Sequence, residues 1–527
     1  MNPSEAMLEI LRSEGVDRVF GNPGTTELTL LEALATADDI TYVLAVQELS
    51  AVAMADGYAR ATGRTAFVNL HVAAGLANGL IGMLNAKRSR VPLVVTAGQQ
   101  DRRHLMEDPM LSGDLVGLAT AASKHAVEVQ HARDLPIVLR RAFALAAQPP
   151  AGPVFVSIPM DLLAEDVDVA VPPRSPRTSL GAATGLDRAA WILAGADRLG
   201  IVAGDGVGRD DAVAELVVLA ERLSATVYHQ PMHDRVNFPF THSLHAGMLA
   251  PRNAVIRETL DKHDVVLVVG SHAFSPHHYT PGPAVPPQTR VVQLDDDPAA
   301  LGRNFPVELG LTGGIRVSLA ELGALVGRRT NSVPRKRTAP DGATLTTAAA
   351  PLDPQLAART IATAMPADAT VVDEAITVGV LLRPLLRLVE PGSFVHTVGG
   401  GLGWGVGAAV GTRMGRPDRP VVAVLGDGCA MFGLQGLWSA ARYQVPVLLL
   451  VMNNGEYRTL KETLAESGST GPHPGLDLGR MDWVTAARFF GIAARRVASD
   501  DELRDVVARA GDLTAPLLVD VPILGKK

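Results

Sequence analysis

Two glycine turns, Gly426-Asp427-Gly428 and Asn453-Asn454-Gly455, carry a carboxylate and an amide side chain 27 positions apart. Asp427 and Asn454 each follow an apolar run, at residues 420–425 and 446–452, and these runs predict two strands. Residues 430–443 between them are long enough for a crossover helix. Because neighbouring parallel strands end at the same edge of a sheet, we expect both side chains at that edge.

These residue types suit a hard divalent cation. Mg²⁺ takes oxygen ligands, usually one or two from the protein and others from substrate phosphates. Asp427, Asn454 and a backbone carbonyl near Glu456 would hold Mg²⁺ that bridges a diphosphate, while Gly426 and Gly428 would let the backbone approach phosphate oxygens. A lone GDG is more often a surface turn, but GDG with NN at this distance resembles the thiamine diphosphate fingerprint.

An enzyme with that cofactor needs a carboxylate beside the aminopyrimidine ring, because protonation of the ring makes its exocyclic amine basic enough to remove the thiazolium proton. Glu48 is the candidate, since it follows the apolar run 40–46 and precedes Ala55-Asp56-Gly57-Tyr58-Ala59-Arg60, which resembles the helix after the activating Glu in such enzymes. In isolation, Glu48 would be an ordinary acidic residue at a helix N-terminus.

The elements that must position these residues alternate between strand-like and helical patterns, which predicts an α/β protein of three doubly wound parallel-sheet domains. Residues 1–170 form the first domain, which is expected to bind the pyrimidine. Residues 352–527, the expected diphosphate-binding domain, repeat its plan, and the strand near 515–522 echoes the one near 152–159. The two ends of the chain therefore look like a duplicated fold.

A middle domain is predicted at residues 185–328, and a linker rich in Thr, Ala, Pro and basic residues at 329–351. The run Gly204-Asp205-Gly206-Val207-Gly208 invites a dinucleotide interpretation. Position 209 is Arg, however, so the last glycine of GxGxxG is missing and a plain tight turn is favoured.

Bulk properties exclude several classes of protein. The chain has 527 residues, of which 20% are charged, and a net charge of −7, so no basic face for nucleic acid is implied. Cys429 is the single cysteine, which excludes an intrachain disulfide and fits a reducing cytoplasm. The apolar runs are too short to span a bilayer, and residues 2–11 favour a capped domain helix over a signal peptide.

Along nearly its whole length the chain resembles the thiamine diphosphate decarboxylase family, of the benzoylformate decarboxylase type. The resemblance is carried by the diphosphate motif and by residues 21–27 (GNPGTTE), 46–48 (VQE), 69–75 (NLHVAAG), 96–100 (TAGQQ), 277–282 (HHYTPG) and 400–403 (GGLG). It implies thiamine diphosphate and Mg²⁺ as cofactors and a small 2-keto acid as substrate. It also implies active sites that form across a subunit interface, hence a homodimer or homotetramer.

The resemblance also implies residue roles. His71 and His277 would transfer protons, Thr25 stands where the family has a carboxylate-binding Ser, and Leu402 would force the cofactor into its V shape. Thr377 and Cys429 would lie beside the diphosphate. Where the family places aromatic side chains around the substrate, this chain offers His396, Glu462 and Thr463. We therefore expect a wider, more polar pocket and leave the natural 2-keto acid open.

The expected reaction is non-oxidative decarboxylation of a 2-keto acid to an aldehyde and CO₂. The first alternative is a carboligase or acetohydroxyacid synthase-like transferase, which gives the same enamine to a second carbonyl. The presence of both His71 and His277 favours protonation over this transfer. The second alternative is a catalytically silent binding protein, which the intact Glu48, Asp427 and Asn454 disfavour.

Overall fold

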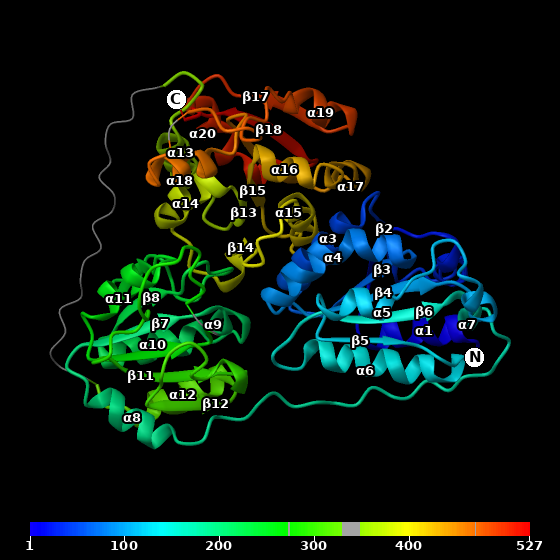
Figure 1. Ribbon diagram of the computed structural model, residues 1–527, viewed down its shortest axis with the longest axis horizontal. Helices are drawn as coiled ribbons and strands as arrows, with labels where there is room; N and C mark the ends of the chain where they lie inside the picture. The colour runs from blue at the N-terminus through cyan, green and yellow to red at the C-terminus, as the bar shows by residue number, and fades with distance from the viewer. Residues whose placement is uncertain (272–273, 329–347, 470, 527) are drawn as a thin grey trace. The chain divides into compact units, whose positions relative to one another are not determined.

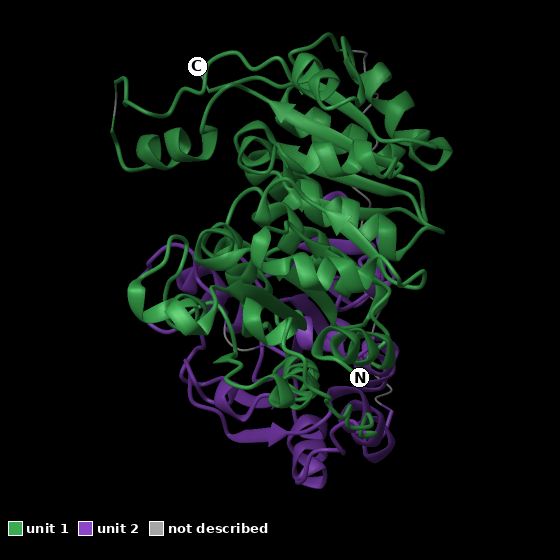
Figure 2. Cartoon of the chain, turned by 90° about the vertical axis from the view of Figure 1, so that its right-hand side faces the viewer, with its two compact units in different colours: residues 1–176, 347–382, 397–527 green, residues 177–346, 383–396 purple. Residues whose placement is uncertain are grey.

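The computed structural model describes residues 1–271, 274–328, 348–469 and 471–526. Within these residues, eighteen strands form three sheets of six with helices as the connections, and the strand pairs such as β1–β2, β7–β10 and β15–β16 are parallel, which confirms the predicted α/β class. The chain divides into two compact units (Figure 2). Unit 1 comprises residues 1–176, 347–382 and 397–527, and unit 2 comprises residues 177–346 and 383–396.

The first sheet has the strand order β2-β1-β3-β4-β6-β5. In Figure 1, helices α3 and α4 lie on one side of it and α1 and α6 on the other. Its strands are β1 (Arg18–Gly21), β2 (Thr41–Leu44), β3 (Ala66–Leu70), β4 (Leu93–Gln99), β5 (His125–Glu128) and β6 (Val154–Pro159). Its helices are α1 (Pro3–Ser13), α2 (Leu28–Leu34), α3 (Glu48–Thr62), α4 (Val72–Arg88), α5 (Leu115–Thr120), α6 (Leu135–Ala147) and α7 (Met160–Leu163).

The third sheet, with the order β14-β13-β15-β16-β18-β17, repeats the order of the first strand for strand. This agrees with the duplication expected from the sequence. Its strands are β13 (Thr370–Glu374), β14 (Phe394–His396), β15 (Val421–Gly426), β16 (Val447–Asn453), β17 (Ala493–Arg496) and β18 (Leu517–Pro522). The helices are α13 (Pro354–Ala364), α14 (Ile376–Leu382), α15 (Trp404–Gly415), α16 (Asp427–Phe432), α17 (Gly436–Arg442), α18 (Arg458–Glu466), α19 (Trp483–Phe489) and α20 (Asp500–Ala508).

The middle sheet has the order β12-β11-β10-β7-β8-β9, which is the doubly wound order of dinucleotide-binding folds. Two apolar clusters pack against it. Its strands are β7 (Leu199–Ala203), β8 (Thr226–His229), β9 (His245–Met248), β10 (Val265–Val269), β11 (Arg290–Asp295) and β12 (Leu309–Thr312). Its helices are α8 (Leu186–Ala194), α9 (Asp205–Arg209), α10 (Val213–Leu223), α11 (Asn253–Leu260) and α12 (Ile315–Leu325).

The glycine run at 204–208 supplies the N-cap, Gly204, and the first four residues of the short helix α9 (Asp205–Arg209), so it is not a simple tight turn. A Cβ at Gly206 would lie 2.6 Å from the Cα of Gly270, so this glycine permits close packing of backbone on backbone. The buried carboxylate of Asp205 accepts hydrogen bonds from the side chains of Gln230 (2.6 Å) and Asn237 (2.8 Å). Internal packing therefore explains this run without a nucleotide.

The structure has two helices where the sequence predicts one crossover helix between the glycine turns. The segment 430–443 was expected to be one helix, but α16 ends at Phe432 and α17 begins at Gly436. A Cβ at Gly433 would lie 2.2 Å from the carbonyl oxygen of Gly403, so the chain breaks where it passes this carbonyl. The linker predicted at 329–351 lies outside the described residues from 329 to 347.

Within unit 1, α3 packs closely on α15. A Cβ at Gly57 would lie 2.1 Å from the carbonyl oxygen of Ala408, and one at Gly411 would lie 1.9 Å from that of Met54. The contact is made by main-chain atoms, which only glycine allows.

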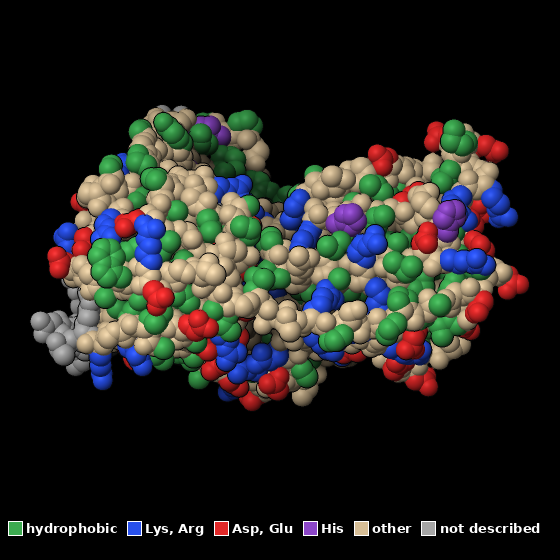
Figure 3. Space-filling model, turned by 90° about the horizontal axis from the view of Figure 1, so that it is seen from below, with side chains coloured by type: hydrophobic (Ala, Val, Ile, Leu, Met, Phe, Trp, Pro, Cys, Tyr) green, Lys and Arg blue, Asp and Glu red, His purple; other side chains and the backbone are tan. Residues whose placement is uncertain are grey.

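The surface and the helices agree with an ordinary globular chain. Acidic and basic side chains are interspersed on the face in Figure 3, as on ordinary solvated protein surfaces. Among the described residues, no helix combines the length and the apolar character needed to cross a bilayer.

Candidate active site

The carboxyl edge of the third sheet brings the two glycine turns together. Asp427 follows β15 and Asn454 follows β16, which is paired with β15 in parallel. One carboxylate oxygen of Asp427 accepts the N–H of Gly428 (2.8 Å), and the other accepts those of Asn454 (3.0 Å) and Gly455 (2.7 Å). Burial raises the pKa of Asp427, and these backbone hydrogen bonds oppose that effect.

Oxygen atoms and small residues gather around this edge. The Asn454 side-chain oxygen accepts the N–H of Glu456 (3.0 Å), which forms a tight turn in which Gly455 has a φ of +69°. The hydroxyls of Thr377 and Thr459 lie 3.3 Å apart. Cys429 is buried, and that burial raises the pKa of its thiol, so the side chain is a neutral filler.

A buried carboxylate that the sequence did not single out caps the helix beside this edge. Glu374 ends β13, and its two oxygens accept the N–H groups of Trp404 (3.0 Å) and Gly405 (2.9 Å) at the start of α15. Gly403, before them, has a φ of +89°, which favours glycine. Glu374 thereby fixes the turn that carries Leu402, and burial raises its pKa to about 8.

We expect the variant Glu374→Gln to be less stable than the unchanged protein at pH 5.5, with a stability gap that closes and reverses by pH 8. Gln keeps one acceptor oxygen, and loss of the other costs about 1 kcal/mol. The folded pKa of Glu374, about 8, lies above its ordinary value of 4.5, so folding stability of the unchanged protein falls as pH rises through this window. Gln has no such dependence. Denaturant midpoints of the cofactor-free proteins at both pH values measure the gap, and a gap that is the same at both would contradict the prediction.

At the first sheet, Glu48 is the first residue of α3 and is buried. Its two carboxylate oxygens accept hydrogen bonds from the side-chain amides of Asn22 and Asn78, each at 3.0 Å. A Cβ at Gly75 would lie 3.1 Å from one of these oxygens. The amides hold the carboxylate in one orientation. Asn78 was missed because its position on α4 has no distinguishing local pattern.

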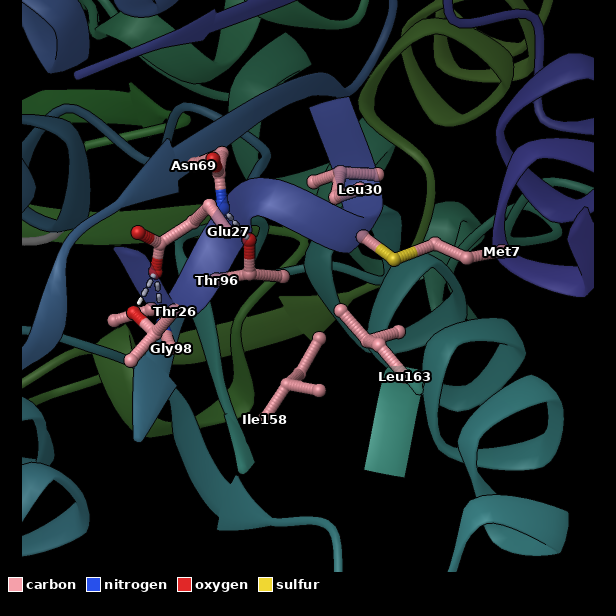
Figure 4. Close-up of a pocket in the computed structure, with 10 residues that line it drawn as sticks. Met7, Thr26, Glu27, Leu30, Asn69, Thr96, Gly98, Ile158 and Leu163 are labelled. Atoms are coloured by element: carbon pink, nitrogen blue, oxygen red, sulfur yellow. Dashed lines mark hydrogen bonds between the residues drawn. The ribbon is translucent and has the colours of Figure 1, made fainter. Parts of the chain in front are cut away.

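His71 is oriented by a second buried carboxylate, Glu27. The Nδ1 atom of His71 lies 2.9 Å from one Glu27 oxygen, which also accepts the N–H of Gly24. The other oxygen accepts the hydroxyl of Thr26 (2.7 Å) and the N–H of Gly98 (2.9 Å) (Figure 4). A carboxylate can only accept, so Nδ1 carries the hydrogen and Nε2 is left for other partners. Like Asn78, Glu27 was not predicted from the sequence as a site residue.

Thr25 begins the short 3₁₀ helix Thr25–Glu27, and its side chain is exposed. Thr463 is exposed on α18, where its hydroxyl donates to the backbone carbonyl of Thr459 (3.0 Å). Glu462, next to it, is paired with Arg458 at 2.8 Å. The hydroxyl of Thr463 and the carboxylate of Glu462, two of the polar groups expected around the substrate, thus already have partners within α18.

The other two candidates lie in unit 2. His277 is in the loop after β10; its backbone N–H donates to the carbonyl of Pro251 (2.8 Å), and its Nδ1 lies 3.1 Å from Nε2 of His278. His396 is buried, with its imidazole 3.3 Å from the guanidinium of Arg383.

Comparisons with known proteins agree on one family. Residues 1–120, 186–322 and 378–521 match the N-terminal TPP binding domain, the central domain and the C-terminal TPP binding domain of thiamine pyrophosphate enzymes. The chain is 36% identical to benzoylformate decarboxylase of Pseudomonas aeruginosa over 98% of both chains. The chain belongs to the thiamine pyrophosphate enzyme family. It is also 30% identical to a putative acetolactate synthase large subunit of Mycobacterium tuberculosis, over 99% of both chains.

Solved structures give the same result. A thiamine diphosphate-dependent 4-hydroxybenzoylformate decarboxylase of Rhodococcus jostii aligns with a TM-score of 0.93 at 33% identity, over 100% of both chains. Benzoylformate decarboxylase of Polynucleobacter necessarius aligns with a TM-score of 0.94 at 29% identity, over 100% of this chain and 99% of that one. This thiamine pyrophosphate enzyme is thus similar to benzoylformate decarboxylases in sequence and in fold.

The residues present fit the cofactor that the family name carries. The donor set at the third sheet consists of carboxylate, amide and backbone oxygens, which is the set a magnesium diphosphate needs. A Cβ at Gly428 would lie 2.9 Å from the ring of Tyr457, so the turn has no room for a side chain there. The N-terminal TPP binding domain also contains a buried carboxylate, Glu48.

Proposed function

We propose that this protein catalyses the non-oxidative decarboxylation of an aromatic or related 2-keto acid to an aldehyde and CO₂. The observation that carries this proposal is the joint presence of a buried, amide-held Glu48 and the tied Asp427 and Asn454 turns in a chain 36% identical to a benzoylformate decarboxylase. The cofactor, when bound, supplies a nucleophilic carbon and an electron sink for the departing carboxylate.

At the diphosphate end, Asp427 and Asn454 would hold Mg²⁺ through side-chain oxygens and Glu456 through its backbone carbonyl. The main chain at Gly426 and Gly428 would face the phosphate oxygens. Thr377 and Cys429 would lie beside the diphosphate, and Leu402 would lie beneath the rings. The orientation of Leu402 is supported by the Glu374 cap on α15.

At the reacting end, Glu48 would share a proton with the aminopyrimidine ring, with its orientation held by Asn22 and Asn78. The hydroxyl of Thr25 would donate a hydrogen bond to the substrate carboxylate. His71, held by Glu27, would exchange a proton with the substrate through Nε2, and His277 would serve as the second proton carrier. We further propose a homodimer or homotetramer, with sites completed between subunits, in the cytoplasm.

The alternative is carboligation of the acetolactate synthase type, and the 30% identity to a putative acetolactate synthase supports it. The two reactions differ in whether a proton or a second carbonyl captures the carbanion. The presence of two histidines suited to proton transfer, His71 and His277, favours capture of the carbanion by a proton. The alternative would be preferred if an acceptor diverted most of the product.

One assay separates these functions. The purified protein, supplied with thiamine diphosphate and Mg²⁺, is given a panel of aromatic and aliphatic 2-keto acids, and CO₂ and aldehyde are measured with and without an acceptor aldehyde. We expect one aldehyde per CO₂ from at least one aromatic acid. CO₂ without free aldehyde would indicate carboligation, and no CO₂ from any acid would contradict the proposal.

The variant Thr463→Phe is expected to raise kcat/KM for benzoylformate by about one decade. An aromatic ring adds tens of Å² of apolar contact, which at roughly 25 cal/mol per Å² corresponds to about 1–2 kcal/mol of binding. His396→Phe is not a suitable companion, because His396 is buried against Arg383. The matched control is Thr363→Phe on α13, whose exposed hydroxyl makes the same bond to the carbonyl four residues back.

If the unchanged enzyme already prefers benzoylformate to every other acid in the panel, the argument for a polar pocket fails. Equal gains in Thr463→Phe and Thr363→Phe would also remove Thr463 from the substrate site. Steady-state kinetics on each acid supply both comparisons.

A further inference from the structure

The segment 453–458, which we call the cofactor loop, joins β16 to α18 and carries two of the three proposed metal ligands. Asp427 holds it from one side through the N–H groups of Asn454 and Gly455. On the other side, the carboxylate of Glu456 is buried and has two partners. One oxygen lies 2.5 Å from Nζ of Lys461, and the other accepts the backbone N–H of Lys526 at 2.5 Å.

The cofactor loop also forms a short antiparallel ladder with the segment after α18. Tyr457 donates its N–H to the carbonyl of Leu476, and Leu478 donates to that of Gly455, both at 2.8 Å. Glu456 and Asp477 are directly opposite each other in this ladder. Lys461 lies 2.5 Å from Asp477 as well, so its single ammonium group joins the two opposed residues.

This ladder packs on the turn that the cofactor diphosphate would approach. A Cβ at Gly428 would lie 2.9 Å from the Tyr457 ring and 3.3 Å from a methyl group of Leu478. A displacement of the ladder would therefore shift the loop that carries Asn454 and the Glu456 carbonyl.

We propose that the ion pair between Glu456 and Lys461 positions the cofactor loop for the metal and diphosphate. This inference rests on the proposed function, which gave Glu456 a role through its backbone carbonyl alone. Its side chain has a separate role, because a substitution at Glu456 changes the ion pair and keeps the carbonyl. Glu456 and Lys461 are thus positioning residues in the sense that they act through the loop backbone.

Burial decides which partner of Lys461 matters. The side chain of Glu456 is 7% exposed and that of Asp477 is 76% exposed. An exposed pair is screened by water and contributes little, whereas a pair with a buried carboxylate is screened much less. Asp477→Asn is therefore the matched control for Glu456→Gln, since both changes remove one carboxylate from the same ammonium group.

The test is a calorimetric titration of the full chain with thiamine diphosphate at fixed Mg²⁺ concentration. We expect Glu456→Gln and Lys461→Met each to raise Kd on the order of tenfold, and Asp477→Asn to change it less than about twofold. The double variant of Glu456 and Lys461 should bind about as well as either single variant, because both changes remove the same interaction.

Hydrogen exchange of the cofactor-free proteins gives a second readout. The amides of Tyr457 and Leu478, which close the ladder, should exchange faster in Glu456→Gln than in Asp477→Asn. Unchanged affinity and exchange in Glu456→Gln, with normal binding by the unchanged protein, would overturn this inference and leave the proposed function intact. An equal loss in Asp477→Asn would also overturn it. Failure of the unchanged protein to bind the cofactor would overturn the proposed function itself.

Discussion

The variant Glu48→Gln is expected to slow exchange of the C2 proton of bound thiamine diphosphate by at least about 100-fold, the lower range for general acid–base catalysis. The amide cannot share a proton with the aminopyrimidine ring as the carboxylate can. Its shape is nearly the same, but its NH₂ must face the amide of either Asn22 or Asn78, both of which donate to Glu48. We therefore also expect a small loss of thermal stability.

NMR on the bound cofactor measures the exchange, and calorimetry with Mg²⁺ shows whether the cofactor still binds. Binding should change little, because Glu48 is proposed to contact the pyrimidine and not the diphosphate. Exchange at the unchanged rate would remove Glu48 from the mechanism. A large loss of binding would instead indicate that Glu48 holds the cofactor in place.

The variant Asp427→Ala should lose most of the rise in melting temperature that thiamine diphosphate and Mg²⁺ give the unchanged protein. A ligand that binds only the folded state stabilises it in proportion to the logarithm of its concentration over Kd. Asp427 is the only proposed metal ligand that would bind through a charged group, and it also ties the Asn454 turn to its own. Loss of the charged ligand and loss of the hydrogen bonds to the Asn454 turn should both weaken cofactor binding.

Asp427→Asn separates the two effects, because the amide oxygen can still accept backbone N–H groups but the charge is gone. Without cofactor, the melting temperature of Asp427→Asn should lie closer to that of the unchanged protein than the melting temperature of Asp427→Ala does. With thiamine diphosphate and Mg²⁺, the melting temperature of Asp427→Asn should still rise little. Asp418→Asn, an exposed carboxylate in the loop before β15, serves as the control. If Asp427→Ala gains as much as the control, the metal assignment of the GDG turn is wrong.

The sequence predicted the strands that position Asp427 and Asn454 because these strands are central. β15 and β16 are covered on both faces, so nearly every residue in them is apolar and the run ends visibly at the glycine turn. The edge strands β5 and β17 were not predicted. Their side chains are largely exposed or half-buried, and β17 reads Ala-Ala-Arg-Arg, which shows no apolar run.

The carboxylates Glu27 and Glu374 were missed for a different reason. Each is defined by partners that are distant along the chain: the oxygen of Glu27 meets the N–H of Gly98, 71 positions later, and Glu374 meets that of Gly405, 31 positions later. Local spacing carries no signal for such contacts. Buried carboxylates that accept backbone N–H groups become visible only once the strands are in place.

The glycine contacts between α3 and α15 affect how this protein can evolve or be engineered. Where two helices meet through side chains, rotamer changes absorb a substitution, but at Gly57 and Gly411 the neighbouring atoms are main-chain carbonyls that have no rotamers. Even one added methyl group must move a whole helix, and with it Glu48 at the start of α3 or the Leu402 turn before α15. Exposed positions such as Thr463 lack such main-chain contacts across a helix pair, whereas this helix pair constrains mutational paths to those that leave both glycines in place.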